Sequence, residues 1–537
     1  MRRKAPTIWL LNILLLFTAK GFSKTDATSD MGGRVVLVLP FDNRSGQTNL
    51  AWIGDSFPDT LNQRLTSAGF LTITRDDRQY ALAHLGLPVD FRPSRATTIR
   101  IAQTLDADFV IVGSYTVENG RISAQAQILE VNKLRLSEPV TEANELNHLF
   151  DLENAIAWKI ARTMNPHFNV AEQTFLTAAA PIQLSALENY IRGTDAGSPQ
   201  EQIKHLQLAV QLKPNYPAAL LALGKAQYGE HDYDHAAATL IRVPLSDPRA
   251  LEASFYIGLA RFNTAKYAQA ESAFAFITNR LPLPEVVNNQ GVASSRQGHD
   301  AVPLFQRASN ADPNDPDYHY NLAVALYRRG SFAEAQHEVD RTLTLRPSDQ
   351  EAAELKASIR AGKTAGPEKA TADADNSSGF DPLERIRRTF SEASFRQAAF
   401  QLDQMRAIRM ATLPPAEQAT EYTQLGRDYL AQGLVPEAEQ EFQTAIGADS
   451  SSAEAHAGLA QVRERSGDAT RAREEAQASI KLHPNAAAYV VLARLDLKAN
   501  DLGSATSNVS KALRLEPKDS AALGMRQALQ ARGQSIP

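Results

Sequence analysis

The 537-residue sequence contains no cysteine, and this absence excludes several kinds of site together. Without thiols there are no disulfides, no thiolate metal ligands and no cysteine nucleophile. Lipid attachment after a signal sequence is excluded too, because that modification needs a cysteine. A strong charge of either sign is also missing, since 56 basic and 61 acidic residues give a formal net charge of −5. This balance argues against a nucleic-acid-binding protein that depends on a strongly basic surface.

Long apolar runs are almost absent as well. After the first 23 residues no segment has eighteen consecutive apolar residues, so no later membrane span is expected. The start of the chain is different, because the basic stretch MRRKAPT precedes twelve mostly apolar residues and the small residues Gly21 and Ser23. This order predicts a signal peptide over residues 1–23. Cleavage stays open, since Lys20 interrupts the region and no A-x-A site is present. An uncleaved anchor would place the rest of the chain outside the cytoplasm equally well.

Catalytic and metal-binding motifs are the third absence. The sequence contains no G-x-S-x-G, H-E-x-x-H or G-x-G-x-x-G. AGKT at residues 361–364 resembles the end of a phosphate-binding loop, but the upstream glycine position holds Ala357. HDYDH at residues 231–235 offers two histidines four apart, and no third ligand can be assigned. The sequence therefore predicts a protein without catalysis, metal or cofactor.

A regular spacing of prolines is the main positive signal. Small residues lie twelve positions before most of these prolines, and paired small and large residues at i, i+3 and i+4 spacing predict helices with apolar faces. Ala438 keeps the same register with Ser450 in the proline position. The prolines are Pro214, Pro248, Pro282, Pro313, Pro347, Pro484 and Pro517, and the small residues are Ala236, Ala270, Ala301, Ala335, Ala472 and Ala505.

A period of about 34 residues with these landmarks resembles the tetratricopeptide repeat, TPR. The resemblance implies an all-α solenoid whose inner groove is lined by the first helix of each unit and binds peptides or helices of other proteins. It also implies which positions of each unit face that groove. They are Lys225, Tyr228, Phe255, Phe262, Asn263, Tyr320, Tyr327 and Arg328 in a first block, and Arg427, Gln461 and Arg465 in a second. Alternatively, several of them, Phe255 and Phe262 above all, pack between helices.

The part before the repeats has a different pattern. From Arg34 to about His167, apolar runs and amphipathic stretches follow the order β-α-β-α-β-β-α, which predicts a small α/β domain with a mixed sheet. VLPFDNRSG at residues 38–46 and ADFVIVGSYTVENGRISAQAQILEV at residues 107–131 resemble the TolB amino-terminal-like domain. That resemblance implies a bacterial envelope protein. The β-propeller that follows this domain in TolB is absent, so a Tol-Pal role is not inferred.

The predicted fold is therefore multidomain, with a small α/β domain followed by an all-α solenoid in two blocks. The stretch KTAGPEKATADADNSSG has no apolar period and predicts a flexible linker between the blocks. A degenerate unit, RTFSEASFRQAAFQLDQM, is expected to begin the second block near Phe380. The expected divisions are signal peptide 1–23, TolB-like domain 33–170, TPR block 183–360, linker 361–378, and TPR block with capping helix 379–533.

These features predict a non-catalytic exported scaffold, periplasmic or envelope-associated. Its expected partners are other proteins or peptides, including envelope components, and not nucleic acid. Two alternatives stay open. In one, the α/β domain binds a small molecule and the repeats report it; in the other, the chain is an enzyme whose motif is not recognisable. The identity of the partner, the oligomeric state and the independence of the two blocks also stay open.

Overall fold

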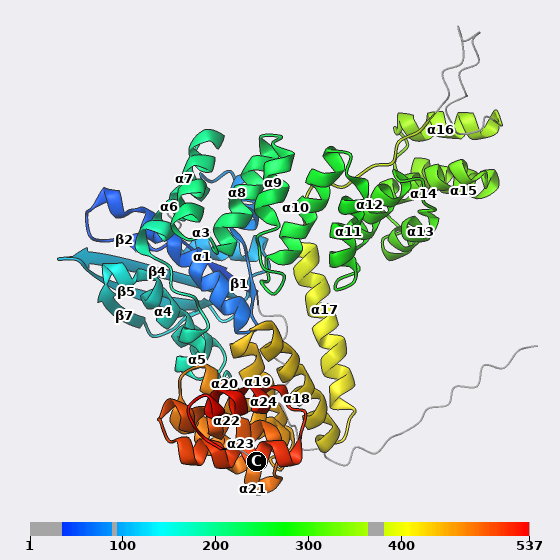
Figure 1. Ribbon diagram of the computed structural model, residues 1–537. Coiled ribbons are helices and arrows are strands. Elements are labelled where there is room, and N and C mark those ends of the chain that lie inside the picture. Colours follow the sequence, from blue (N-terminus) through cyan, green and yellow to red (C-terminus); the bar gives the residue numbers. More distant parts are fainter. Residues whose placement is uncertain (1–34, 89–93, 363–380, 536–537) are drawn as a thin grey trace, which may run out of the picture.

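The computed structural model describes residues 35–88, 94–362 and 381–535. The expected signal peptide and nearly all of the expected linker lie outside these residues. A small α/β region is followed by two sets of packed helices (Figure 1). In the described part of the chain, no helix is both long and apolar enough to cross a membrane.

One mixed sheet forms the centre of the α/β region. Its order is β3-β1-β4-β5-β6, with β2 beside β4 and β7 beside β5. β1 runs parallel to β3 and β4, whereas β4 and β5 are antiparallel and joined by Asn119 and Gly120, both with positive φ. The predicted mixed sheet is confirmed, and β6 and β7 add to the strands expected from sequence. The strands are β1 (Val35–Val38), β2 (Asp42–Asn43), β3 (Leu71–Thr72), β4 (Phe109–Glu118), β5 (Arg121–Glu130), β6 (Arg135–Leu136) and β7 (Val140–Glu145).

Helices cover both faces of this sheet. α1 and α4 bury their apolar side chains against one face, while α2 and α3 pack on the other, because alternate residues of β1 and β4 point to opposite sides. The core beneath α1 continues without a break into the first helices of the repeats, through Leu187, Leu206 and Leu220. The elements are η1 (Thr48–Leu50), α1 (Trp52–Ser67), α2 (Arg75–His84), α3 (Arg95–Thr104), η2 (Leu146–His148), α4 (Leu149–Met164) and α5 (Glu172–Thr177).

The first helical block begins with the degenerate pair expected after residue 183. Each small residue of the predicted register in this block, Ala236, Ala270, Ala301 and Ala335, is buried where the two helices of a pair meet. The helices are α6 (Leu184–Asp195), α7 (Pro199–Leu212), α8 (Pro217–Gly229), α9 (Tyr233–Leu240), α10 (Ala250–Asn263), α11 (Tyr267–Thr278), α12 (Pro284–Ser295), α13 (Val302–Ala311), α14 (Pro316–Arg329), α15 (Phe332–Leu345) and α16 (Gln350–Arg360).

The second helical block corrects one expectation. The stretch expected to begin it as a degenerate helix pair forms one long helix, α17, and residues 381–390 before α17 belong to no helix or strand. Regular pairs start only at α18. The helices are α17 (Glu392–Ala411), α18 (Pro415–Gln432), α19 (Val435–Ala448), α20 (Ala453–Arg465), α21 (Ala469–Leu482), α22 (Ala486–Lys498), α23 (Leu502–Leu515) and α24 (Ser520–Gln530).

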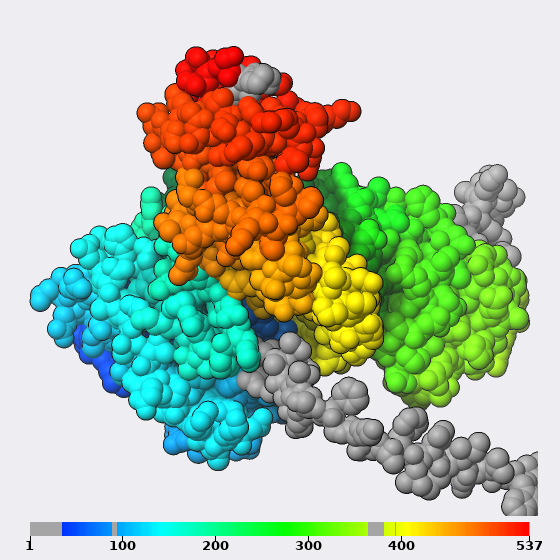
Figure 2. Space-filling view, turned by 90° about the horizontal axis from the view of Figure 1, so that it is seen from below, coloured from blue at the N-terminus to red at the C-terminus, as the bar shows by residue number. Residues whose placement is uncertain are grey.

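The second block folds back onto the α/β region (Figures 1 and 2). The backbone N–H of Ala171, just before α5, donates to Glu439 Oε1 at 2.9 Å. On another side, Arg396 of α17 pairs with Asp77 of α2 at 2.7 Å. The α/β region is thus in contact with both α17 and the second block.

Candidate functional site

The chain places one of its own segments across the first block. Residues 381–390, here called the groove segment, run over the first helices of successive pairs, α16, α14, α12 and α10, before entering α17. The faces of these four helices that meet the groove segment are called the groove. These are the helices that the repeat resemblance assigns to the inner surface of a solenoid.

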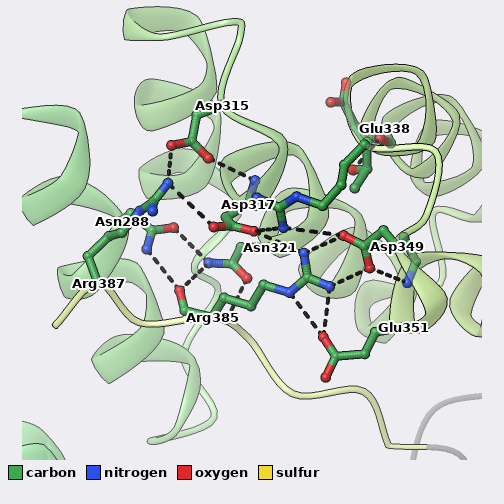
Figure 3. Close-up of polar contacts among 12 residues, drawn as sticks. Asn288, Asp315, Asp317, Asn321, Glu338, Asp349, Glu351, Arg385 and Arg387 are labelled. Atoms are coloured by element: carbon green, nitrogen blue, oxygen red, sulfur yellow. Dashed lines mark hydrogen bonds and ion pairs between the residues drawn. The ribbon is translucent and has the colours of Figure 1, made fainter.

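Asparagine side chains hold the main chain of the groove segment (Figure 3). Asn321 Nδ2 donates to Arg385 O at 2.7 Å, and the Arg385 N–H donates back to Asn321 Oδ1 at 2.7 Å. Asn289 repeats this arrangement two residues further on, with 2.8 Å to Arg387 O and 2.7 Å from the Arg387 N–H. Asn288 Nδ2 adds a second donor to Arg385 O at 3.0 Å. The amides therefore act on an extended chain as a neighbouring strand would.

Arg385 is bound by carboxylates from two helix ends. Its terminal nitrogens lie 2.7 Å from Asp349 Oδ1, 2.7 Å from Glu351 Oε2 and 2.9 Å from Asp317 Oδ1. The guanidinium plane also lies 3.8 Å from the ring centre of Tyr320. A planar cation with several donors suits both partners at once, which favours arginine over lysine here.

The flanking charged residues are held in the same way. Arg387 pairs with Asp315 and, at 3.4 Å, with Asp317. In the opposite sense, the fully buried carboxylate of Glu384 pairs with Arg328, and at 3.6 Å with Arg296. The groove therefore offers an acidic region to two arginines and a basic region to the glutamate that precedes them.

The electrostatics of the site follow from these pairs. The hydrogen bond from Arg385 lowers the pKa of Asp349 below its ordinary value. Burial alone would raise the pKa of Asp317, but hydrogen bonds from Arg346 and Arg385 outweigh burial and lower that pKa. Burial likewise opposes the charged form of Arg385, and its carboxylate partners more than compensate and raise its pKa. The groove segment therefore adds to the stabilisation that Arg346 already gives the charged forms of Asp317 and Asp349.

An aromatic contact ends the groove segment. The ring of Phe390 lies 5.5 Å from that of Phe255 in α10 and 4.2 Å from that of Phe395 in α17. Phe255 is completely buried. The apolar end of the groove segment is therefore shared between the first block and the helix that leads to the second.

Three of the residues predicted from sequence to line the groove contact the groove segment: Phe255, Tyr320 and Arg328. Arg328 donates to Ser295 and to Pro382 O as well as pairing with Glu384. Tyr327, beside it in sequence, is 1% exposed and its ring lies 5.9 Å from that of Phe332.

The other predicted groove residues make different contacts. Lys225 pairs with Glu252 at 2.7 Å and with Asp76 of the α/β region at 3.1 Å, beside a cavity of about 280 Å³ next to Phe390. The remainder make contacts within their own blocks. Tyr228 packs on Tyr233 and Tyr256, Phe262 packs on Tyr267, Asn263 donates to Leu259 O, Arg427 pairs with Glu454, Arg465 donates to Leu430 O, and Gln461 is half-buried on α20.

The residues that sequence reasoning missed are the asparagines and the acidic side chains. Asn289 and Asn321 each lie five residues after the proline that begins their helix, Pro284 and Pro316, so they occupy the same place in consecutive units. Asn321 Nδ2 also donates to Asn288 Oδ1 at 2.7 Å. Asp317 stands at the second position of its unit, one of the positions expected to face the groove. The repeated asparagine could have been noticed in the sequence. No feature near residues 381–390 indicated that they bind in the groove.

The histidine cluster at residues 231–235 lies at the turn between α8 and α9. His235 contacts Asp232 at 2.8 Å, and Asp234 pairs with Lys266 at 2.6 Å. Within the described ranges, no group of three histidine or acidic side chains is arranged to hold a metal ion.

Comparison with known proteins supports the repeat assignment. Residues 293–359 and 423–487 each match a tetratricopeptide repeat family model. Neither match covers the α/β region, so the TolB resemblance stays a prediction. No curated protein sequence shows a significant match.

Several solved structures are similar to parts of this chain. MamA from Desulfovibrio magneticus RS-1, residues 41 to the end, is 20% identical over 34% of this chain and 99% of that one, with a TM-score of 0.29. YrrB, a TPR protein with an unusual peptide-binding site, is 14% identical over 38% and 99%, with a TM-score of 0.29. The C-terminal domain of LpoB from Escherichia coli is 24% identical over 22% and 89%, with a TM-score of 0.20. The family matches confirm that this chain contains tetratricopeptide repeats in both of its helical blocks.

Proposed function

We propose that this protein is a non-catalytic scaffold, exported to the bacterial cell envelope, whose first helical block holds partner proteins by an extended segment. Tetratricopeptide repeats in both blocks are consistent with protein–protein interaction. The observation that carries the proposal is the set of asparagine hydrogen bonds to the main chain of the groove segment.

Main-chain recognition of this kind is suited to peptides in general. Each of Asn289 and Asn321 satisfies both the N–H and the C=O of one residue, and the two residues held are Arg385 and Arg387. Because these bonds do not depend on side chains, they give affinity for any extended chain, and the surrounding charges then give selectivity.

The envelope location has a separate basis. The signal-like residues 1–23 and the TolB resemblance over residues 38–46 and 107–131 both favour export. Envelope proteins are accordingly the proposed partners.

Binding of a peptide added in solution tests the function. The probe is a fluorescein-labelled peptide with the sequence of residues 381–390, and the receptor is the full chain carrying Arg385→Ala and Arg387→Ala, which weakens its own groove segment. We expect saturable binding by fluorescence anisotropy. Adding Asn289→Ala and Asn321→Ala to the receptor should weaken binding by about tenfold or more, because several buried hydrogen bonds are lost.

Asn310→Ala is the matched control, since this exposed side chain of α13 accepts from Gln306 of the same helix, outside the groove, and should leave affinity unchanged. Absence of saturable binding, or binding that is indifferent to Asn289 and Asn321, would show that the groove is not a peptide site.

A further inference from the structure

We propose that the groove segment is a self-ligand that a partner protein replaces. The partner carries an extended segment with a glutamate and two arginines at the spacing of Glu384, Arg385 and Arg387. This inference rests on the proposed function, because it names the ligand that the same groove selects. It adds that the groove is already filled and that filling it from outside changes the rest of the molecule.

The acidic part of the groove requires cations. The side chains of Asp315, Asp317 and Asp349 are 15%, 14% and 4% exposed, and all three contact an arginine of the groove segment. Partly buried carboxylates this close together are unfavourable unless positive charges face them. Arg346 of the first block also pairs with Asp317 at 2.7 Å and with Asp349 at 3.5 Å. A replacing segment without two basic side chains would remove the arginine partner of Asp315 and leave Asp317 and Asp349 sharing Arg346, so a neutral peptide fits this site poorly.

The spacing of charges is specified as well. Arg385 and Arg387 are alternate residues of an extended chain, so their side chains leave the same side of the backbone, toward the acidic helix ends. Glu384 leaves the opposite side, where Arg328 and Arg296 enclose it. Ile386, between the two arginines, is half-buried against apolar side chains of the first block. The groove thus recognises an acid, an arginine, an apolar residue and a second arginine in that order.

Nothing in the main-chain contacts is particular to this chain's own segment. The groove segment belongs to no helix and pairs with no strand among the described residues. Leu383 is 55% exposed and Arg388 is exposed, so neither contributes a buried contact. A partner segment with the same charged residues would make the same asparagine hydrogen bonds.

Replacement is coupled to α17 through Phe390. This ring packs between Phe255 of the groove and Phe395 of α17. When the groove segment leaves, Phe390 leaves with it, and α17 loses one of its contacts with the first block, while Phe395 and Ala398 keep theirs. Arg396, which directly follows Phe395, pairs with Asp77 of the α/β region, and this contact is weakened too.

Competition between the peptide and the chain's own segment tests the inference. The labelled peptide of residues 381–390 is titrated into the wild-type full chain and into the Arg385→Ala, Arg387→Ala chain. We expect at least about tenfold weaker binding to the wild type, because its own arginines keep their charge-assisted bonds. At saturating peptide, hydrogen exchange should become faster in residues 384–390 and in the first turn of α17 of the wild-type chain.

A control peptide has glutamate at the two positions of Arg385 and Arg387, and it should bind to neither chain. Equal affinity for both chains, with unchanged exchange in residues 384–390, would overturn self-occupancy while leaving the peptide site intact. If the labelled peptide of residues 381–390 bound to neither chain, the proposed function would be overturned as well. If the wild-type chain formed dimers and the peptide dissociated them, the groove would bind a second copy of this chain. That result would overturn the assignment to a partner protein.

Discussion

Arg385 meets three carboxylates and one aromatic face in the groove of the first block. Its Nη1 and Nη2 donate to Asp349, its Nε and Nη2 donate to Glu351, and its Cζ lies 3.8 Å from the ring centre of Tyr320. Charged side chains of this kind hold the groove segment together with the apolar contacts of Ile386 and Phe390. A single polar side chain is also important inside the α/β region, where the buried carboxyl of Glu153 accepts hydrogen bonds from two hydroxyl groups.

Replacing Arg385 by lysine should loosen the groove segment although the charge is kept. A lysine ammonium cannot contact Asp349 and Glu351 bidentately while stacking on a ring. We expect trypsin to cleave the Arg385→Lys chain within residues 384–388 several-fold faster than the wild type. Arg388→Ala removes an exposed arginine of the same segment and should leave cleavage at the remaining sites unchanged. Equal rates for wild type and Arg385→Lys would mean that charge alone holds the segment.

Glu153 should make stability fall as pH rises. Burial raises its pKa to about 8, and hydrogen bonds from Ser56 and Thr60 only partly oppose this shift. Between the ordinary value of 4.5 and about 8 the native state therefore holds more protons than the unfolded chain, so unfolding becomes easier with increasing pH. We expect Glu153→Gln to be more stable than the wild type near pH 8 and to differ little just above pH 4.5, measured by urea unfolding.

Glu145→Gln, at an exposed end of β7, serves as the control for that measurement. If Glu153→Gln and wild type lost stability in parallel across this pH range, Glu153 would not be the group that titrates.

Helix pairs close tightly where a glycine of one helix faces a large side chain of another. Phe442 of α19 lies between Gly426 of α18 and Gly458 of α20, where added Cβ atoms would come within 2.8 and 2.2 Å of its ring. The same pairing of glycine and aromatic ring recurs at Gly258 and Phe274. The close approach of neighbouring helices thus depends on the missing side chain.

Gly458→Ala should destabilise the second block by about 1–3 kcal/mol, since the ring of Phe442 must move and the helices must separate. Gly447→Ala is the matched control, because this glycine of α19 is exposed and an added Cβ meets nothing within 4 Å. The control should be neutral or stabilising by up to ~1 kcal/mol. Guanidinium unfolding followed by circular dichroism measures both, and equal stability of the two variants would contradict the packing argument.

The sequence predicted elements well wherever contacts are local. The proline and alanine register located the helix pairs, because Ala270, Ala438 and Ala472 meet helices adjacent in the chain. The groove segment was not predicted, since Arg387 lies 98 residues from Asn289 and nothing in its own neighbourhood indicates where it binds. The basic composition of the groove segment is as compatible with a helix as with an extended chain. The distant carboxylates select the extended form.

At the scale of the whole molecule, the α/β region contacts the start of the first block, α17 and the second block. Residues 169–173, which connect the α/β region to the repeats, also receive the second block at Glu439 and Gln443. Arg463 completes a buried ion pair with Glu439 at 2.8 Å at this junction. The connection between the first two regions is therefore itself a docking site for the third.

Export of the whole chain is expected from its first residues. An alkaline phosphatase fused after residue 537 should be active only when residues 1–23 are present, because that enzyme requires an oxidising compartment. The comparison is between the full fusion and one lacking residues 2–23, at matched expression in a bacterial host. Activity that is low in both fusions would place the protein in the cytosol and remove the envelope from the proposal.

The groove segment has a consequence for selectivity in a crowded compartment. A ligand on the same chain faces its site at an effective concentration on the order of mM, so every outside ligand must compete against that level. The apparent affinity of every outside ligand falls by the same factor. Weakly binding basic proteins then no longer bind, whereas a tight partner still does. The same effect disfavours exchange of segments between two copies at ordinary protein concentrations. The occupied groove thus acts as a threshold that only a well-matched partner passes.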